Sequence, residues 1–210
     1  KDVTDDIICL GVFGPKSRDL LSKLTNEDLS NENFKFGTSK ILKIGSANVW
    51  TQRLSYVGEL GYEFYIDQDK GKEIYDLIVN TGKDFQLSHC GSHAMDIMRM
   101  ESGFLHWGHD ISPEENQYQA GLNFAISFKK PFNFIGKEQL QKIKDQKLDR
   151  RFAMFILKNS EPGNPLLLHE EPIYLNDNII GKTTSGNYSF NYDKNLSFGY
   201  IKSDISNEKL

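Results

Sequence analysis

Positions 53–66 carry the sequence Arg53-Leu54-Ser55-Tyr56-Val57-Gly58-Glu59-Leu60-Gly61-Tyr62-Glu63-Phe64-Tyr65-Ile66. Its two glycines bracket a carboxylate, and glycine is the residue that tight turns favour. After the turn, apolar and polar residues alternate with a period of two, which is typical of a strand. The stretch therefore predicts a turn followed by a half-buried strand. One face of that strand would carry Tyr62, Phe64 and Ile66, and the other would carry Glu63 and Tyr65.

The carboxylate of Glu63 has two interpretations. It is either a solvated strand residue or the partner of a heterocycle at the lip of a pocket. In the second case it would accept hydrogen bonds from a ring N–H and from an exocyclic amino group. Tyr56, in the turn before the strand, would then stack on the ring or pack against it.

Further elements are expected on both sides of this stretch. A continuous apolar run at 7–13 is typical of a buried strand, and it would make Cys9 an inert buried thiol. The order strand, helix, three strands and two helices indicates an α+β fold. The remaining strands are expected at 41–44 and 49–54, and the helices after Pro15, at 70–80 and at 92–102.

The second half of the chain changes character. Residues 121–128 alternate like a strand, and a polar helix opens at Gly136 and extends to about Lys147. Beyond it, short apolar segments separated by Gly, Asn and Pro are typical of a small β-domain or barrel. We expect those strands near 152–157, 172–175, 179–184 and 196–201. The predicted domains are therefore 1–147 and 148–210.

Composition excludes several classes of protein. The 210 residues include 25 Lys and Arg against 29 Asp and Glu, a net charge of −4, whereas a nucleic-acid-binding surface needs clustered basic residues. No apolar run approaches the ~18 residues of a membrane span, so no membrane partner is expected. The two cysteines, Cys9 and Cys90, indicate free thiols in a reducing compartment. The sequence thus predicts a cytoplasmic protein.

Other candidate sites are weak. His106 and His109 lie three positions apart beside Asp110, and His89 and His93 flank Cys90, but none of these has the spacing of a zinc motif. We therefore expect no metal site, and we expect the first group to form a hydrogen-bonded turn. No GxSxG elbow or phosphate-binding loop is present either.

Several motifs in order resemble those of the aminomethyltransferase (glycine-cleavage T-protein) family. Residues 55–63 are similar to its YTGE-x-G-[FY]-E signature, and residues 96–103 to its D-x-L-R-x-E-x-G helix. Its QGP turn is matched by Gly14-Pro15, with Phe13 in place of glutamine. The remaining matches are Gly108-His109-Asp110-Ile111, Ala120-Gly121-Leu122 and Phe134-Ile135-Gly136-Lys137-Glu138. The resemblance covers essentially the whole chain and implies a folate-binding domain followed by a β-barrel-like domain.

The stretch His106-Trp107-Gly108-His109-Asp110 is most similar to one branch, the C-terminal folate-binding module of sarcosine and dimethylglycine dehydrogenases. In these enzymes an upstream flavin domain oxidises an N-methyl amine, and the module captures the one-carbon unit as methylenetetrahydrofolate. The resemblance implies that tetrahydrofolate is the cofactor and that Tyr56 and Glu63 contact its pterin. FAD would lie only on a separate upstream domain or partner subunit.

Three positions of the helix predicted at 92–102 carry further expectations. Stand-alone transferases carry an arginine just before the helix aspartate, where this chain has Met95, and this departure also points to the dehydrogenase branch. Arg99 and Glu101 lie two apart on a helix, so they do not face each other and each is expected to pair with a different neighbour.

The chemistry implied by the resemblance is attack of a folate nitrogen on an iminium carbon, with the protein mainly positioning the reactants. The family's proton-handling aspartate would lie upstream of Lys1, so no catalytic residue is assigned. Lys1 would fall partway into the folate module and Leu210 before its last strands, and the isolated chain is expected to be inactive. The alternatives are a stand-alone aminomethyltransferase, a folate-dependent demethylase and a non-catalytic folate-binding module.

Overall fold

The computed structural model describes residues 1–206. The chain divides into two compact units, Lys1–Met95 and Asp96–Leu210, which are described separately. The domain boundary predicted from the sequence lies elsewhere, at 147/148. It refers to domains and not to compact units, so it stays a prediction. The expectation that Leu210 precedes the last strands falls on Asn207–Leu210, outside the described residues.

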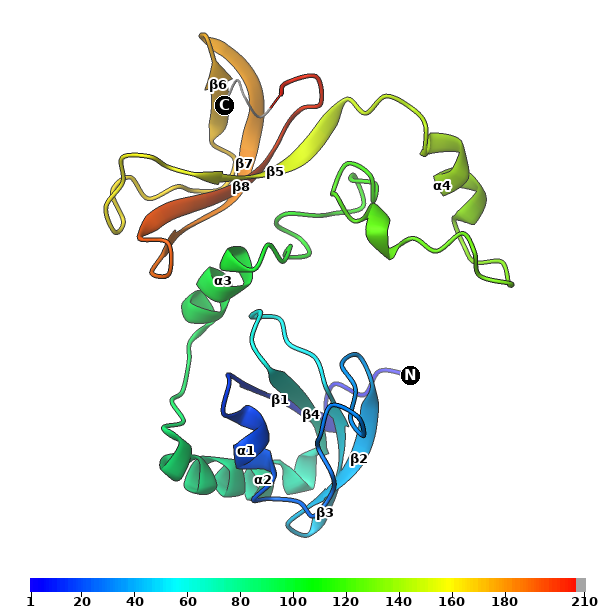
Figure 1. Cartoon of the computed structure of the whole chain (residues 1–210), viewed down its shortest axis with the longest axis vertical. Helices are drawn as coiled ribbons and strands as arrows, with labels where there is room; N and C mark the ends of the chain where they lie inside the picture. Colours follow the sequence, from blue (N-terminus) through cyan, green and yellow to red (C-terminus); the bar gives the residue numbers. More distant parts are fainter. Residues whose placement is uncertain (207–210) are drawn as a thin grey trace. The chain divides into compact units, whose positions relative to one another are not determined.

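The first unit is built on a four-stranded antiparallel sheet in the order β1-β4-β3-β2 (Figure 1). Its strands are β1 (Ile7–Phe13), β2 (Ser39–Ile44), β3 (Ala47–Gln52) and β4 (Gly61–Asp67). Its helices are α1 (Ser17–Leu21), α2 (Gln68–Gly82) and the short η1 (Lys83–Phe85). The strands and helices predicted for this part of the chain are therefore present, with ends shifted by a few residues.

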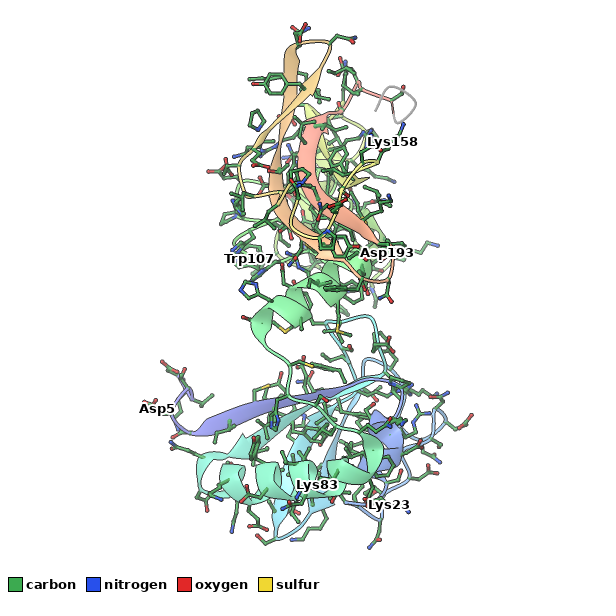
Figure 2. The ribbon with its side chains drawn as sticks, turned by 90° about the vertical axis from the view of Figure 1, so that its left-hand side faces the viewer. Asp5, Lys23, Lys83, Trp107, Lys158 and Asp193 are labelled. Atoms are coloured by element: carbon green, nitrogen blue, oxygen red, sulfur yellow. The ribbon has the colours of Figure 1, made fainter. Side chains whose placement is uncertain are left out.

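Alternation along β4 sends one set of side chains into the core, as predicted. Tyr62, Phe64 and Ile66 are fully buried and pack with apolar residues of α1 and α2. Figure 2 shows α2 on one side of this sheet. The helices thus cover one face, and Glu63 and Tyr65 point to the opposite face because successive strand residues alternate.

The burial predicted for Cys9 is wrong. β1 is an edge strand in which Val12 is the buried apolar residue, and Cys9 is exposed. Its register partner is Tyr65, so it shares the face that the helices leave uncovered. A continuous apolar run cannot distinguish a strand covered on both faces from one covered on a single face.

The helix α3 (Ser92–Glu101) begins in the first unit and ends in the second. Between it and the second sheet lie η2 (Asn123–Ala125) and α4 (Lys137–Ile143). The strand predicted at 121–128 is wrong, because this segment closes into a turn in which Ala125 N–H donates to Leu122 O at 3.0 Å. Phe124 is 82% exposed, so the alternation there does not correspond to a buried face.

The second unit contains a four-stranded antiparallel sheet in the order β5-β8-β7-β6. Its strands are β5 (Arg150–Ile156), β6 (Pro172–Leu175), β7 (Asn178–Ser189) and β8 (Lys194–Lys202). Met100 of α3 packs with Leu196, Phe198 and Phe152 of this sheet. Two antiparallel sheets with helices confirm the α+β class. No helix in the described part of the chain has the length and apolarity to cross a bilayer.

A buried arginine joins α3 to the second sheet. Arg99, whose side chain is 1% exposed, lies 2.5 Å from Asp110 and donates to Ser185 Oγ at 2.8 Å. Asp110 also accepts from the hydroxyls of Thr184 and Ser185 at 2.6 and 2.7 Å. Glu101 pairs separately, accepting from Asn191 Nδ2 at 2.5 Å. Arg99 and Glu101 therefore bind different neighbours, as expected from their spacing.

We expect Asp110→Ala to destabilise the protein by about 2–3 kcal/mol, because it removes the fully buried carboxylate partner of Arg99 and the acceptor of the Ser185 hydroxyl. Arg99 keeps a second counter-charge in Asp96, at 2.7 Å. The matched control is Asp76→Ala, which removes an exposed helix pair with Lys72 at 2.5 Å and should cost less than about 0.5 kcal/mol. Urea unfolding of both variants measures the difference. Equal losses would show that the buried pair has no special role.

Candidate functional site

The predicted site residue Glu63 lies on the face of the first sheet opposite α2, which we call the outer face. It consists of side chains that share this side of three strands by register. Its members are Cys9, Gly11 and Phe13 of β1, Trp50 and Gln52 of β3, and Glu63 and Tyr65 of β4. Glu63 is half-buried at the centre, between Gly11 on β1 and Gln52 on β3.

The carboxylate of Glu63 is held by its neighbour on the same strand face. The hydroxyl of Tyr65 donates to Glu63 Oε2 at 2.9 Å. This hydrogen bond, with burial, raises the pKa of Tyr65 to about 12, so the phenol remains a donor at neutral pH. One carboxylate oxygen is thus oriented by the protein, and the carboxylate keeps acceptor capacity for a ligand.

The ring of Phe13 lies over Gly11, the residue of β1 that is opposite Glu63 in the sheet. A Cβ at Gly11, directly opposite Glu63 in the sheet, would come within 2.6 Å of this ring. A Cβ at Gly61 would come within 2.3 Å of it. Glycine at both positions therefore lets the aromatic ring lie close to the backbone in this chain.

A second aromatic pair lies along the same face. The rings of Trp50 and Tyr65 are 4.8 Å apart and tilted by 36°, and Trp50 remains 43% exposed. Partial burial and the charge of Glu63 raise the pKa of the Cys9 thiol, which disfavours the nucleophilic thiolate. The outer face therefore offers a carboxylate between aromatic rings, with no activated nucleophile at Cys9.

The loop before β4 carries Tyr56, the other predicted site residue, in a half-buried position. Its turn uses Gly58 with a φ of 75°, a conformation that glycine adopts without strain. The loop is fixed at its end, because Leu60 O accepts from Gly14 N–H at 2.8 Å and from Ser17 Oγ at 3.2 Å. The Gly14-Pro15 turn and the signature stretch are thus brought together.

The histidine-rich turn of the second unit has a structural role. His106 O accepts from Asp110 N–H at 2.8 Å, and Asp110 Oδ2 accepts from His106 N–H at 2.9 Å. The rings of His106 and His109 stack at 4.3 Å. Within residues 1–206, no group of three or more His, Cys, Asp or Glu side chains is placed to hold a metal ion.

Three aromatic residues of the outer face were not predicted as site residues: Phe13, Trp50 and Tyr65. The alternation of β4 had already placed Tyr65 beside Glu63 on one face, so this signal was present in the sequence. Phe13 and Trp50 reach the same face only through strand pairing, which a single sequence does not specify.

Comparison with known families gives two matches. The profile of the GCVT N-terminal domain matches residues 1–130, and that of the glycine cleavage T-protein C-terminal barrel domain matches residues 150–209. Together they cover most of the chain in the order that the motifs predicted.

Individual relatives agree with these profiles. Human mitochondrial dimethylglycine dehydrogenase is 38% identical over 98% of this chain and 23% of its own length. The aminomethyltransferase of Halothermothrix orenii is 34% identical over 96% of this chain and 54% of its own length. The chain therefore spans about a quarter of the dehydrogenase and about half of the transferase.

Among solved structures, the crystal structure of glycine cleavage system aminomethyltransferase T from Bartonella henselae has a TM-score of 0.76. It is 20% identical in sequence, and the match covers 93% of this chain and 52% of that one. At this identity the match establishes a shared fold.

We expect Glu63→Gln to lower the pKa of Tyr65 from about 12 towards its ordinary value of 10.0, because the charged acceptor is lost. NMR titration of ring-labelled tyrosine measures this, with Tyr65→Phe assigning the signal. In the wild type, a raised folded-state pKa means that the stabilisation is complete below pH ~10 and disappears as the pH rises towards ~12. An unchanged tyrosine titration in Glu63→Gln would contradict the hydrogen bond.

Proposed function

As the chain belongs to the family of the GCVT N-terminal domain and the glycine cleavage T-protein C-terminal barrel domain, we propose that it binds tetrahydrofolate and positions it for one-carbon transfer. The observation that carries this proposal is the carboxylate of Glu63, held by Tyr65 at 2.9 Å among the aromatic rings of the outer face.

The residues present fit the pterin of tetrahydrofolate. A pterin presents a ring N–H next to an amino group, and a carboxylate can accept from both in a bidentate arrangement. The flat ring of the pterin also matches the aromatic side chain of Phe13, which lies over Gly11 next to Glu63. Tyr56, in the loop before β4, would pack against the bound ring.

Bound tetrahydrofolate supplies a nucleophilic nitrogen, and the chain's own residues supply orientation. Glu63 would fix the rotation of the pterin within its plane, and Phe13 would limit movement out of that plane. Holding a reactant in one geometry raises its effective concentration at the reaction partner. Among residues 1–206, none is proposed as the proton acceptor.

The larger enzyme that we propose is an FAD-dependent amine dehydrogenase of the sarcosine or dimethylglycine type. Met95, which is 39% exposed, stands where stand-alone transferases carry an arginine, and a dehydrogenase is among the relatives. FAD would then bind to an upstream domain or a partner subunit. An upstream reading frame with a GxGxxG flavin motif supports this assignment, and one without it favours the aminomethyltransferase, which is also among the relatives.

The compartment proposed from the thiols is the cytoplasm, with both cysteines free. The dehydrogenase relative is named as mitochondrial, so fractionation of cells that express the complete protein distinguishes the two locations.

We expect tetrahydrofolate to bind in calorimetric titration and Glu63→Gln to weaken binding by about 2 kcal/mol, a roughly thirtyfold rise in Kd. The substitution keeps the shape of the side chain but replaces an acceptor oxygen with a donor. Glu59→Gln, an exposed carboxylate in the preceding turn, is the matched control and should bind as the wild type does. Equal Kd values for all three proteins, or no binding to any of them, would refute the assignment of the site.

Phe13→Leu should weaken tetrahydrofolate binding about threefold to tenfold, because it removes an aromatic contact worth about 0.5–1.5 kcal/mol and keeps an apolar side chain. Phe36→Leu changes an exposed phenylalanine outside the outer face and controls for the loss of a ring. If both variants bind equally well, Phe13 does not contact the pterin.

A further inference from the structure

Gln52, the last residue of β3, lies next to Glu63 on the outer face. The two residues are register partners in the antiparallel pair of β3 and β4. Side chains of directly opposed residues lie on one face of a sheet, with their Cβ atoms about 5 Å apart. Both residues are half-buried, so the amide of Gln52 and the carboxylate of Glu63 are neighbours that solvent still reaches.

The other positions directly around Glu63 on this face offer no free side-chain donor. Gly11, its partner on β1, and Gly61, two residues earlier on β4, carry no side chain. Tyr65, two residues later, already donates its hydroxyl proton to Glu63 Oε2 at 2.9 Å. A ligand group bound beside Glu63 therefore finds its side-chain donor at Gln52.

The amide of Gln52 is unoccupied, although the strand end that carries it is fixed. In the part of the chain that the structure describes, residues 1–206, the Gln52 side chain makes no hydrogen bond. The next residue, Arg53, donates from its backbone N–H to Thr38 O at 2.9 Å and from Nη2 to Asn31 Oδ1 at 2.7 Å. Gln52 thus keeps two N–H donors and a carbonyl oxygen for a ligand, at a position that the backbone holds in place.

The pterin of tetrahydrofolate presents three polar groups in a row along one edge: the 2-amino group, the N3–H and the 4-oxo oxygen. The first two are donors, and a carboxylate accepts from both in a bidentate arrangement. The 4-oxo oxygen is an acceptor that loses its water when the ring binds, so it needs a donor from the protein. An uncharged amide N–H beside the carboxylate meets this need.

We propose that Gln52 donates from Nε2 to the 4-oxo oxygen of the pterin while Glu63 accepts from the 2-amino group and the N3–H; this inference rests on the proposed binding of tetrahydrofolate. A carboxylate has two equivalent oxygens, so by itself it holds the ring equally well in either of two flipped orientations. A donor on one side of the carboxylate removes this ambiguity. Gln52 lies on the β3 side of Glu63 and Gly11 on the β1 side, so the 4-oxo group points towards β3.

The first measurement is calorimetric titration of the full 210-residue chain with tetrahydrofolate. Gln52→Leu should raise the Kd about fivefold to tenfold, because one neutral hydrogen bond is lost. Gln52→Met, which keeps the length of the side chain, should show the same loss. The matched control is Asn48→Leu, which removes an exposed amide on the same side of β3, roughly 13 Å along the strand, and should leave the Kd unchanged.

The second measurement reports on the 4-oxo group itself. Tetrahydrofolate labelled with ¹³C at C4 should show its C4 resonance further downfield on the wild type than on Gln52→Leu, because a hydrogen bond deshields a carbonyl carbon. A general loss of packing would weaken binding without this difference. Both Gln52 variants should unfold in urea with the wild-type midpoint, since the side chain that they replace makes no hydrogen bond within residues 1–206.

Unchanged tetrahydrofolate affinity in both Gln52 variants, or equal C4 shifts on the wild type and on Gln52→Leu, would overturn this inference and leave the proposed function standing. Equal weakening in Asn48→Leu would also overturn it, because any amide on this face would then matter as much. Failure of the wild type to bind tetrahydrofolate would overturn the inference and the proposed function together.

Discussion

The guanidinium of Arg99 faces the carboxylate of Asp110 at 2.5 Å with both side chains essentially removed from solvent. Two charges so deeply buried are tolerated only when each finds its counter-charge and further hydrogen bonds. Here the hydroxyls of Thr184 and Ser185 donate the further hydrogen bonds to Asp110. The end of α3, the turn at His106 and the strand β7 must therefore meet in one arrangement, and the motif that contains Arg99 serves the fold of the second unit.

The first unit depends on a different constraint, the covering of only one face of its sheet. Apolar residues of β4 meet α1 and α2 in the core, so the intervening residues Glu63 and Tyr65 lie outside it. Gly11 and Gly61 then allow the ring of Phe13 to lie close to the strands. A single alternating segment thus contributes both to the core and to the candidate site, because neighbouring strand residues point in opposite directions.

Elements with a strong local period were predictable when a neighbouring element packs against them. A periodic segment without a neighbouring strand was predicted wrongly. The helix α2 and the strand β4 follow from spacing alone, and Glu63 follows from its place in β4. Residues 121–128 alternate just as well but form turns with Phe124 exposed, because a strand also needs a neighbouring strand to bind its backbone. The predicted burial of Cys9 was wrong for a related reason. Whether helices cover a face of the sheet depends on tertiary packing and not on the sequence of one strand.

By itself, the sequence determined the α+β class, the family and the side of β4 on which Glu63 lies, because periodicity and motif order are carried by neighbouring residues. Only the tertiary structure decided what surrounds them. Phe13 comes beside Glu63 through the pairing of β1 with β4. Ser185 reaches Arg99 across 86 positions of chain. Such contacts depend on strand pairing and on the burial of charge, which no local pattern specifies.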